Sequence, residues 1–366
     1  MTKRYVLVIR IKLGILACLL SFTALSQRID FSAEVDYIVE DTVKYTYEMI
    51  EADLGFFKKY YPEWVHEEKV GKSQFGLELY TIRIGKGEAK KNSVFLVGNI
   101  HAREDYSSKF LMKFTNVLLL NLAGKDTTYR NIIPILDSMD LYIMPVANPD
   151  GLKIAHLNFK GIEKQFAAVK DSIIVIETLE EWKANGIGID INTSFDDGNH
   201  SVKKGDTYQE SPASEGYKGK FPAEPIETRY IQDFVKRKQP LFTASFHTKG
   251  NIIFWADGGT HTYFLGLDEK INLKATSVSG FRVAHISKNP ESYGCGLENY
   301  VRARLGLLGS CVELSSPEKR RKQFPDANFN KEVWQLAWKI PEVYITEAYH
   351  NRYMIREISK RVQAVK

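Results

Sequence analysis

The sequence predicts one α/β domain, and three observations support this fold class. Short apolar runs alternate with segments of helical periodicity, no internal repeat or low-complexity tract occurs, and no linker divides residues 36–350. The composition, with 26% charged and 44% hydrophobic residues, is typical of a globular chain and allows a large buried core. We therefore expect a single domain over residues 27–366, with its core at about 36–350.

Helices are predicted where apolar residues recur at helical spacing, and strands where short apolar runs are bounded by turn residues. The first helix ends at Tyr61-Pro62, because proline disfavours helix at the preceding residue. In order, the predicted helices cover residues 36–61, 107–121, 227–236, 297–305 and most of 331–362. The predicted strands cover residues 94–97, 141–146, 241–246, 252–255 and 310–314, with 241–246 and 252–255 forming a strand pair broken at Lys249-Gly250. The polar stretch 196–220 predicts a long surface loop.

Residues 1–26 have the features of an export signal. A basic start precedes an apolar run from Leu13 to Leu25, and Ala24-Leu25-Ser26 has the small outer residues that a signal peptidase needs. We expect cleavage before Gln27, a periplasmic or extracellular location, and no membrane span in the mature chain. An uncleaved anchor is the alternative, although the apolar run is short for a span.

Three cysteines are too few for a small disulfide-stapled framework. Cys18 matches a lipoprotein site poorly, because Leu16 is large for that motif and apolar residues continue beyond the cysteine. Export leaves Cys295 and Cys311 in the mature chain, where they form either a disulfide or two buried free thiols.

The formal net charge of +5 does not indicate nucleic-acid binding. Lys3, Arg4, Arg10 and Lys12 supply four of these charges, so removal of the signal leaves a net charge near +1. A chain this close to neutrality has little bulk attraction for phosphate backbones. We expect no nucleic-acid partner.

Residues 98–104 carry the clearest local signal for chemistry, at the end of a buried strand. His101 and Glu104 are three positions apart, so one turn can direct an imidazole nitrogen and a carboxylate at the same ion, a pair that suits zinc. His247 closes a later strand, and ligands collect at strand ends in doubly wound sheets. Three protein ligands would leave a position open for water, as in catalytic zinc sites. Taken alone, His-x-x-Glu is a weak signal for a metal, because a histidine beside a turn is more often a plain hydrogen-bonding residue.

The remaining histidines have no ligand-like neighbours and are expected to be ordinary hydrogen-bonding residues; they are His66, His156, His200, His261, His285 and His350. Glu313 lies in an apolar strand, where burial would raise its pKa towards the range of a general base. The alternative for a strand-end glutamate is an ion pair.

Five segments occur together in a fixed order: His101-Ala102-Arg103-Glu104, Asn148-Pro149-Asp150-Gly151, Gly188-Ile189-Asp190-Ile191-Asn192, His247 before an apolar strand, and Glu313. In order and spacing they resemble the zinc carboxypeptidase superfamily of the carboxypeptidase A type, over about residues 36–350. The resemblance implies an α/β fold whose central, mixed, mostly eight-stranded twisted sheet is flanked by helices. It also implies one zinc ion held by His101, Glu104 and His247, with Glu313 as general base.

Further segments narrow the resemblance to one subgroup; they are residues 181–185, 217–222, 246–255 and Glu227-Thr228. They look like the bacterial γ-D-glutamyl-L-diamino-acid peptidases, which cut stem peptides of peptidoglycan. Within this pattern Lys183 takes the place of the cationic group that polarises the scissile carbonyl. A solvated lysine is the alternative.

One position departs from the family pattern. The chain has Asn192-Thr193 where the family has Asn-Arg, so Asn192 remains to orient substrate but the arginine that binds a terminal carboxylate is missing. Its loss should weaken binding of that carboxylate unless another cation substitutes. Arg103 matches the family's arginine in the zinc motif and is expected to hold a carboxylate elsewhere in the cleft.

Two more residues match substrate-contacting positions of the family. Glu298 aligns with the residue that selects the substrate side chain, and a carboxylate there favours an amine such as that of lysine or diaminopimelate. The alternative is an exposed charge at a helix start. Tyr293, which Gly294 and Gly296 follow, matches the mobile tyrosine that covers the substrate.

We therefore expect an exported zinc metallopeptidase that hydrolyses an amide bond in a peptide or muropeptide carrying a diamino acid. Zinc lowers the pKa of its water, Glu313 removes the proton, and Lys183 with zinc stabilises the oxyanion. Two alternatives remain: a zinc-dependent deacylase or amidase acting on amino-acid conjugates, and a muropeptide-binding protein without turnover.

Overall fold

The structure is a computed structural model that describes residue 39 and residues 43–205, 207–317 and 326–365. The chain divides into a unit Met1–Asp36, which lies outside the described residues, and a compact unit Tyr37–Lys366. The expected export signal and Cys18 therefore lie outside the described residues. Every described helix and strand belongs to the second unit.

A mixed sheet of eight strands runs through the described part of the chain, in the order β1-β2-β4-β3-β5-β8-β6-β7. The central strands β4, β3, β5 and β8 run parallel to one another. β1 runs antiparallel to β2, β2 runs antiparallel to β4, and β6 runs antiparallel to β8. The expected mixed eight-stranded sheet is confirmed. The strands are β1 (Val65–Lys72), β2 (Glu78–Ile84), β3 (Asn92–Gly98), β4 (Met139–Met144), β5 (Phe242–Thr248), β6 (Ile252–Phe254), β7 (Arg282–Val283) and β8 (Leu308–Leu314).

Helices connect these strands and cover the sheet. They are α2 (Tyr47–Tyr60), α3 (Asp105–Leu122), α4 (Pro149–Ala155), α5 (Glu163–Val169), α6 (Ile226–Lys238), α7 (Leu267–Ser279), α8 (Leu297–Leu305), α9 (Gln335–Ala337), α10 (Ile340–His350) and α11 (Arg352–Ala364). Short 3₁₀ turns cover Pro134–Asp137, Lys170–Ser172, Ile191–Thr193 and Asp326–Asn328, and a π-helical turn covers Asn330–Trp334.

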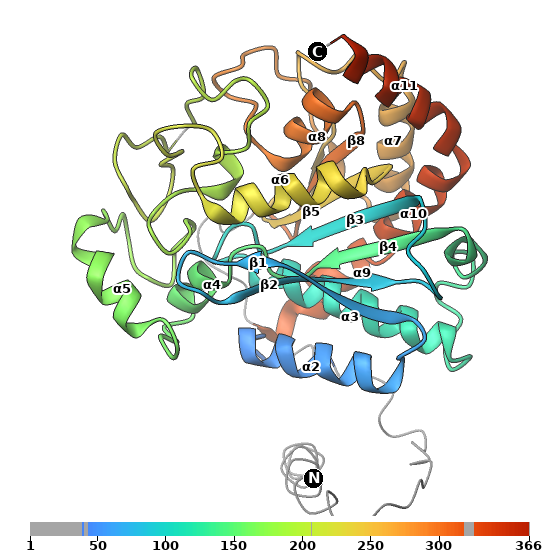
Figure 1. Cartoon of the computed structure of the whole chain (residues 1–366), viewed down its shortest axis with the longest axis horizontal. Helices are drawn as coiled ribbons and strands as arrows, with labels where there is room; N and C mark the ends of the chain where they lie inside the picture. Colours follow the sequence, from blue (N-terminus) through green and yellow to red (C-terminus); the bar gives the residue numbers. More distant parts are fainter. Residues whose placement is uncertain (1–38, 40–42, 206, 318–325, 366) are drawn as a thin grey trace, which may run out of the picture. The chain divides into compact units, whose positions relative to one another are not determined.

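Helices lie on both faces of the sheet, with α6 on one side of the strands and α2 and α3 on the other (Figure 1). Phe110 of α3 packs against Phe246 of β5, with ring centroids 5.1 Å apart. On the opposite face Phe234 of α6 packs against Phe95 of β3 at 4.7 Å. Successive strand residues point to opposite faces, so His247, which follows Phe246, points towards the face that α6 covers.

Two predicted elements differ in their bounds from the observed ones. The first helix begins at Tyr47 rather than near residue 36, because Thr46 is extended and its side chain accepts a hydrogen bond from the Met49 amide, which caps the helix there. β4 ends at Met144, two residues earlier than predicted, where Pro145 removes a ladder donor.

The predicted pairing of residues 241–246 with 252–255 is wrong. β5 and β6 are both strands, but β8 lies between them and pairs with each. β8 is apolar and almost entirely buried, so the centre of the sheet is the position that suits it. The other predicted elements are confirmed, and the described residues of 196–220 contain no helix or strand.

Both cysteines of the described chain, Cys295 and Cys311, are buried free thiols, so they form no disulfide. No helix among the described residues combines the length and apolarity that crossing a bilayer requires.

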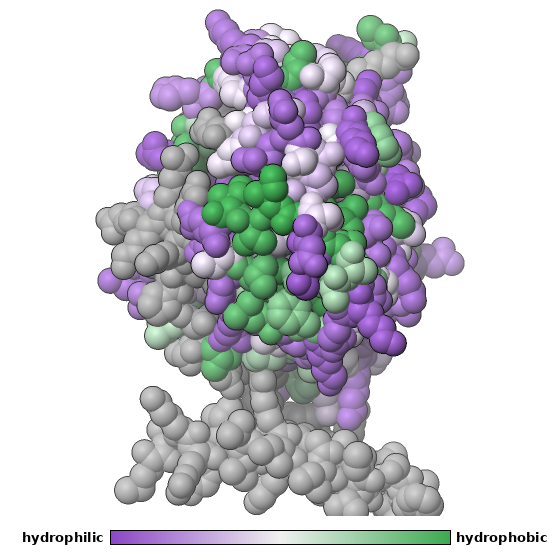
Figure 2. Space-filling view, turned by 90° about the vertical axis from the view of Figure 1, so that its left-hand side faces the viewer, coloured by the Kyte–Doolittle hydropathy of each residue, from purple (hydrophilic) through white to green (hydrophobic). Residues whose placement is uncertain are grey.

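Apolar side chains also gather on one surface. Figure 2 shows an apolar patch, surrounded by hydrophilic residues, on the face that lies at the left of Figure 1, where α5 is found. The segment after α5 exposes Ile174, Val175 and Ile176. Patches with polar rims are typical of surfaces that contact other molecules.

A buried ion pair joins α7 to α8. Arg302 Nη2 lies 2.7 Å from Asp268 Oδ2, and both side chains are 1% exposed. Arg302 Nε also donates to Thr260 Oγ1 over 2.8 Å. Because both charges are out of water, each depends on the other for compensation.

We predict that Asp268→Ala lowers the free energy of unfolding by about 3–5 kcal/mol, because it leaves the Arg302 guanidinium buried and unpaired. Glu357→Ala removes a carboxylate from an exposed pair with Lys360 and should change stability little. Chemical denaturation of the two variants and the parent measures both effects. Equal midpoints for all three proteins would show that the buried pair does not stabilise the fold.

Candidate active site

The segment between β3 and α3 brings His101 and Glu104 to the carboxyl end of the sheet. Gly98 ends β3 in a crowded place, where a Cβ atom would lie 2.9 Å from the Pro145 carbonyl oxygen. Asn99 then turns the chain with a φ of 50°, and its Nδ2 donates to the carbonyl oxygen of His101 over 3.1 Å. This tight turn fixes the direction of the two side chains that follow it.

The adjacent strands β5 and β8 supply two more side chains. His247 and Glu313 are directly opposed in the parallel pairing of these strands, near the carboxyl end of each. Opposed residues share a face of the sheet, so the imidazole and the carboxylate point into the same space.

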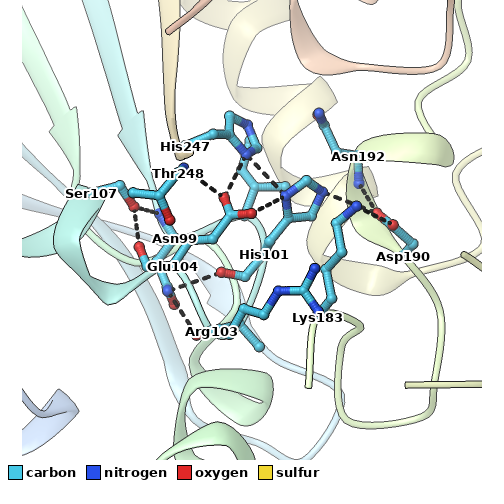
Figure 3. A network of polar contacts seen from close by, with 12 residues as sticks. Asn99, His101, Arg103, Glu104, Ser107, Lys183, Asp190, Asn192, His247 and Thr248 are labelled. Atoms are coloured by element: carbon cyan, nitrogen blue, oxygen red, sulfur yellow. Dashed lines mark hydrogen bonds and ion pairs between the residues drawn. The ribbon is translucent and has the colours of Figure 1, made fainter. Parts of the chain in front are cut away.

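Three of these side chains converge (Figure 3). His101 Nδ1 lies 3.0 Å from Glu104 Oε1 and 3.0 Å from His247 Nδ1, and His247 Nδ1 lies 2.9 Å from Glu104 Oε2. All three residues are buried, and their ligand atoms lie within 4.8 Å of one another. The structure therefore brings the predicted ligand set together.

The donor set fits a zinc ion. Two atoms each about 2 Å from a tetrahedral zinc lie roughly 3.3 Å apart, so small adjustments would accommodate the ion. Burial opposes ionisation of Glu104, but the imidazoles lower its pKa, so its carboxylate is available as a ligand. Burial would likewise lower the pKa of His101, yet Glu104 and Asp190 raise it to about 9, so the cluster attracts positive charge. These features match a divalent cation bound by two imidazoles and a carboxylate.

Asp190 is a site residue that the sequence analysis quoted within a motif but did not select. Its Oδ1 lies 3.2 Å from His101 Nε2, and its Oδ2 lies 3.4 Å from Lys183 Nζ. Its Oδ1 also accepts the backbone N–H of Asn192 over 3.1 Å. Burial opposes ionisation, but Lys183 and His101 lower the pKa of Asp190, which therefore remains charged. An acid on the outer nitrogen of a ligand histidine fixes its tautomer and orientation.

Glu313 is a half-buried residue whose Oε2 atom is buried without a neutralising partner. No hydrogen bond reaches its Oε2 from the described residues. Burial and the nearby charge of Glu104 raise the pKa of Glu313 to about 8. The ion-pair alternative considered for this glutamate is not what the structure shows, since the described residues give it no ion pair.

Lys183 and Arg103 both lie in the wall of a cavity of about 450 Å³ beside the His-Glu-His cluster. Lys183 is one-fifth exposed, so it is not a solvated surface lysine. Arg103 is already paired, with Nη1 2.9 Å from Glu215 Oε2 and donating to the Glu181 carbonyl. An acid of the same chain therefore already pairs with one nitrogen of the guanidinium that is expected to hold a substrate carboxylate.

A second cavity of about 370 Å³ adjoins the first, and both are lined by His101, Lys183, Thr193, Lys203 and Glu313. Asn192, Tyr293 and Glu298 line the second cavity, as expected for residues near a substrate.

Glu298 lies in the first turn of α8 but is not an exposed helix-start charge, since its Oε2 is buried without a hydrogen-bond partner. Burial above all, helped by the charges of Asp257 and Asp197 and opposed by Lys203, raises the pKa of Glu298 to about 7. A cationic group entering the second cavity would meet this carboxylate.

Lys203 was missed by the sequence analysis. It comes from the polar stretch 196–220, where a lysine is normally solvated, and no local motif marks it. In the structure it is 8% exposed and lines both cavities.

The polar contacts of the other histidines are those of ordinary hydrogen-bonding residues. His66, His200 and His261 approach backbone carbonyl oxygens, and His156 Nε2 lies 3.1 Å from Asp105 Oδ2. His285 lines the second cavity and is not part of the convergent cluster.

Comparison with known proteins agrees with this geometry. The zinc carboxypeptidase family model matches residues 50–300. The γ-D-glutamyl-L-diamino acid endopeptidase 1 of Lysinibacillus sphaericus is 25% identical over 224 residues, which cover 60% of this chain and 54% of that protein. Bovine carboxypeptidase A1 is 29% identical over 180 residues, 48% of this chain and 37% of that protein. The chain spans 37% to 60% of the length of such curated relatives.

Solved structures share the fold. The crystal structure of thrombin-activatable fibrinolysis inhibitor matches with a TM-score of 0.65 at 19% identity, covering 84% of this chain and 74% of that one. The bovine form of that protein, in complex with a tick carboxypeptidase inhibitor, matches with a TM-score of 0.59 at 18% identity, covering 85% and 97%. The eight-stranded sheet, the buried His-Glu-His cluster at its carboxyl end and the family match over residues 50–300 lead to one conclusion: the chain belongs to the zinc carboxypeptidase family.

Proposed function

We propose that this chain is an exported zinc metallopeptidase that hydrolyses amide bonds in peptidoglycan stem peptides carrying a diamino acid. One observation carries the hydrolytic part of the proposal. The buried carboxylate of Glu313, with an unpartnered oxygen, is opposed to His247 on paired strands and opens into both cavities. A carboxyl group whose pKa is raised by burial, next to a metal cluster, is suited to receive and return a proton.

The proposed mechanism assigns one step to each group. When bound by His101, Glu104 and His247, zinc supplies a Lewis acid that polarises the scissile carbonyl and lowers the pKa of water. Glu313 takes a proton from a water molecule, and the resulting hydroxide attacks the carbonyl carbon. As the C–N bond breaks, Glu313 returns the proton to the leaving amine.

Neighbouring residues orient the substrate and stabilise charge in this scheme. The Lys183 ammonium stabilises the developing oxyanion, while Asp190 holds both Lys183 and His101 in place. Asn192 orients the substrate from the wall of the second cavity, and Tyr293 covers it.

The substrate class rests on Glu298 and on the similarity to the diamino acid endopeptidase. A half-ionised carboxylate inside the second cavity favours a substrate side chain that ends in an ammonium group. The export part rests on the sequence pattern of residues 1–26, with residues 27–366 as the catalytic domain.

We expect one zinc ion per chain, bound by the His-Glu-His cluster. His247→Ala should lose the metal and the hydrolytic activity, because it removes one of three ligands. His66→Ala, whose imidazole contacts the Gly85 carbonyl instead, should retain both. Elemental analysis of the purified proteins, with peptide hydrolysis before and after chelation and zinc return, measures the outcome. Full zinc content in His247→Ala would refute the assigned ligand set.

Glu313→Gln should lower kcat for stem-peptide hydrolysis by about 10²–10⁴-fold while zinc content is unchanged, because the amide cannot take up the proton. Glu291→Gln removes an exposed carboxylate and is the matched control. Product analysis by mass spectrometry, on stem peptides and on acyl amino acids, measures the loss. Activity that survives in Glu313→Gln would reject the assigned base. Cleavage of acyl amino acids alone would favour a deacylase, and muropeptide binding without any cleavage would favour a binding protein.

The pKa of about 7 at Glu298 predicts a pH-dependent KM. Below this pH the carboxyl is protonated and attracts an ammonium weakly; above it the carboxylate binds the ammonium. KM for a lysine-ended peptide should therefore fall between pH 6 and pH 8, whereas KM for its norleucine counterpart should not follow this trend. Glu298→Gln should abolish the difference between the two peptides. Parallel pH profiles for both peptides in the parent protein would contradict the assignment.

A further inference from the structure

Lys203 is a buried cation without a carboxylate partner. Its side chain lies in the walls of both cavities, yet no acid of the described residues lies within ion-pair distance of its Nζ. The ammonium makes one hydrogen bond, to the Ser292 carbonyl oxygen over 2.8 Å. A buried ammonium is costly unless an anion completes its surroundings, and burial accordingly lowers the pKa of Lys203.

The backbone around Lys203 is firmly held, so its position is not that of a loose surface lysine. Its amide donates to the Asn199 carbonyl over 2.9 Å, and its own carbonyl accepts from Lys218 Nζ over 2.7 Å. The next residue, Lys204, donates its amide to the Glu291 carbonyl over 3.0 Å. The segment that carries Lys203 is thereby tied to the turn that carries Tyr293.

The surroundings of Lys203 suit an anionic ligand group. Thr193 lines the same two cavities with a short neutral side chain, and Arg103 is paired with Glu215. Lys183 is engaged by Asp190. Of these three cationic side chains, Lys203 alone has no acid of the described chain within ion-pair distance, and the carboxylates of Asp190, Glu298 and Asp197 act on it only from farther away.

We propose that Lys203 binds the free terminal carboxylate of the substrate residue whose side-chain ammonium enters the cavity of Glu298. The two opposite charges line the second cavity without pairing with each other, so a ligand that carries both an ammonium and a carboxylate satisfies both. The proposed ligand is thus a C-terminal diamino acid with its carboxylate free, recognised by charge-assisted hydrogen bonds. The choice of peptide rests on the proposed function.

The test compares two peptides that differ only at that carboxylate. L-Ala-γ-D-Glu-L-Lys and its C-terminal carboxamide are titrated calorimetrically into zinc-loaded Glu313→Gln protein, in which turnover is suppressed. The Glu313→Gln protein without a further substitution, which is the parent background, should bind the free acid about 10- to 100-fold more tightly than the amide. Adding Lys203→Met should remove this preference, whereas Lys220→Met, which changes an exposed lysine outside the lining of both cavities, should keep it. Lys203→Arg, which retains a cation, should restore part of it.

Each outcome decides the proposal. Equal affinity for both peptides in the parent background overturns it without any further variant. A Lys203→Met protein that still prefers the free acid also overturns the proposal. The same holds if the substitution weakens binding of both peptides equally, because Lys203 would then only hold the Ser292 turn in place. Failure of the wild-type protein to hydrolyse stem peptides would defeat the proposed function, but the binding comparison would still decide the role of Lys203.

Discussion

The parallel pairing of β5 with β3 on one side and β8 on the other is the constraint on which the site depends. It places the end of β3, with the turn that carries His101 and Glu104, beside His247, and it places His247 opposite Glu313. A slip of one residue in either pairing would turn a key side chain to the opposite face, where α3 packs against Phe246. The metal cluster and the buried acid therefore follow from the register of the central strands. The close packing of Gly98 against Pro145 supports the same geometry.

Charge compensation organises the rest of the cleft. Asp190 contacts the outer nitrogen of His101 and the ammonium of Lys183, so one carboxylate serves both the cluster and the cation proposed to stabilise the oxyanion. Arg103 and Glu215 neutralise each other in the wall of the first cavity. Glu298 and Lys203 differ from these residues, because each lines the cavity without an ion-pair partner among the described residues. Glu298 and Lys203 are therefore the charges in the wall of the second cavity that a ligand of opposite charge could compensate.

The sequence predicted the fold class, most elements and the ligand set, because each of these leaves a local trace. His101 and Glu104 are close in the chain at a strand end, and His247 and Glu313 lie in apolar strands whose ends meet in a parallel sheet. The order β5-β8-β6 leaves no such trace, since strands adjacent in sequence need not be adjacent in the sheet. Lys203 lies in a polar stretch, and its side chain contacts Ser292, which is 89 residues away in the sequence. Asp190 was visible within a motif, and the signal for selecting it was the need of a ligand histidine for an acid on its outer nitrogen.

The central claim is that two imidazoles and one carboxylate bind a single zinc ion at the ends of β3 and β5. X-ray absorption spectroscopy at the zinc edge of the purified, metal-replete protein tests it most directly, because it reports the ligand types and their distances. The account predicts nitrogen and oxygen scatterers at about 2.0–2.2 Å, with the outer-shell signature of two imidazoles and no sulfur. A sulfur scatterer near 2.3 Å, which would implicate Cys311 in the wall of the second cavity, or a spectrum without imidazole would contradict it.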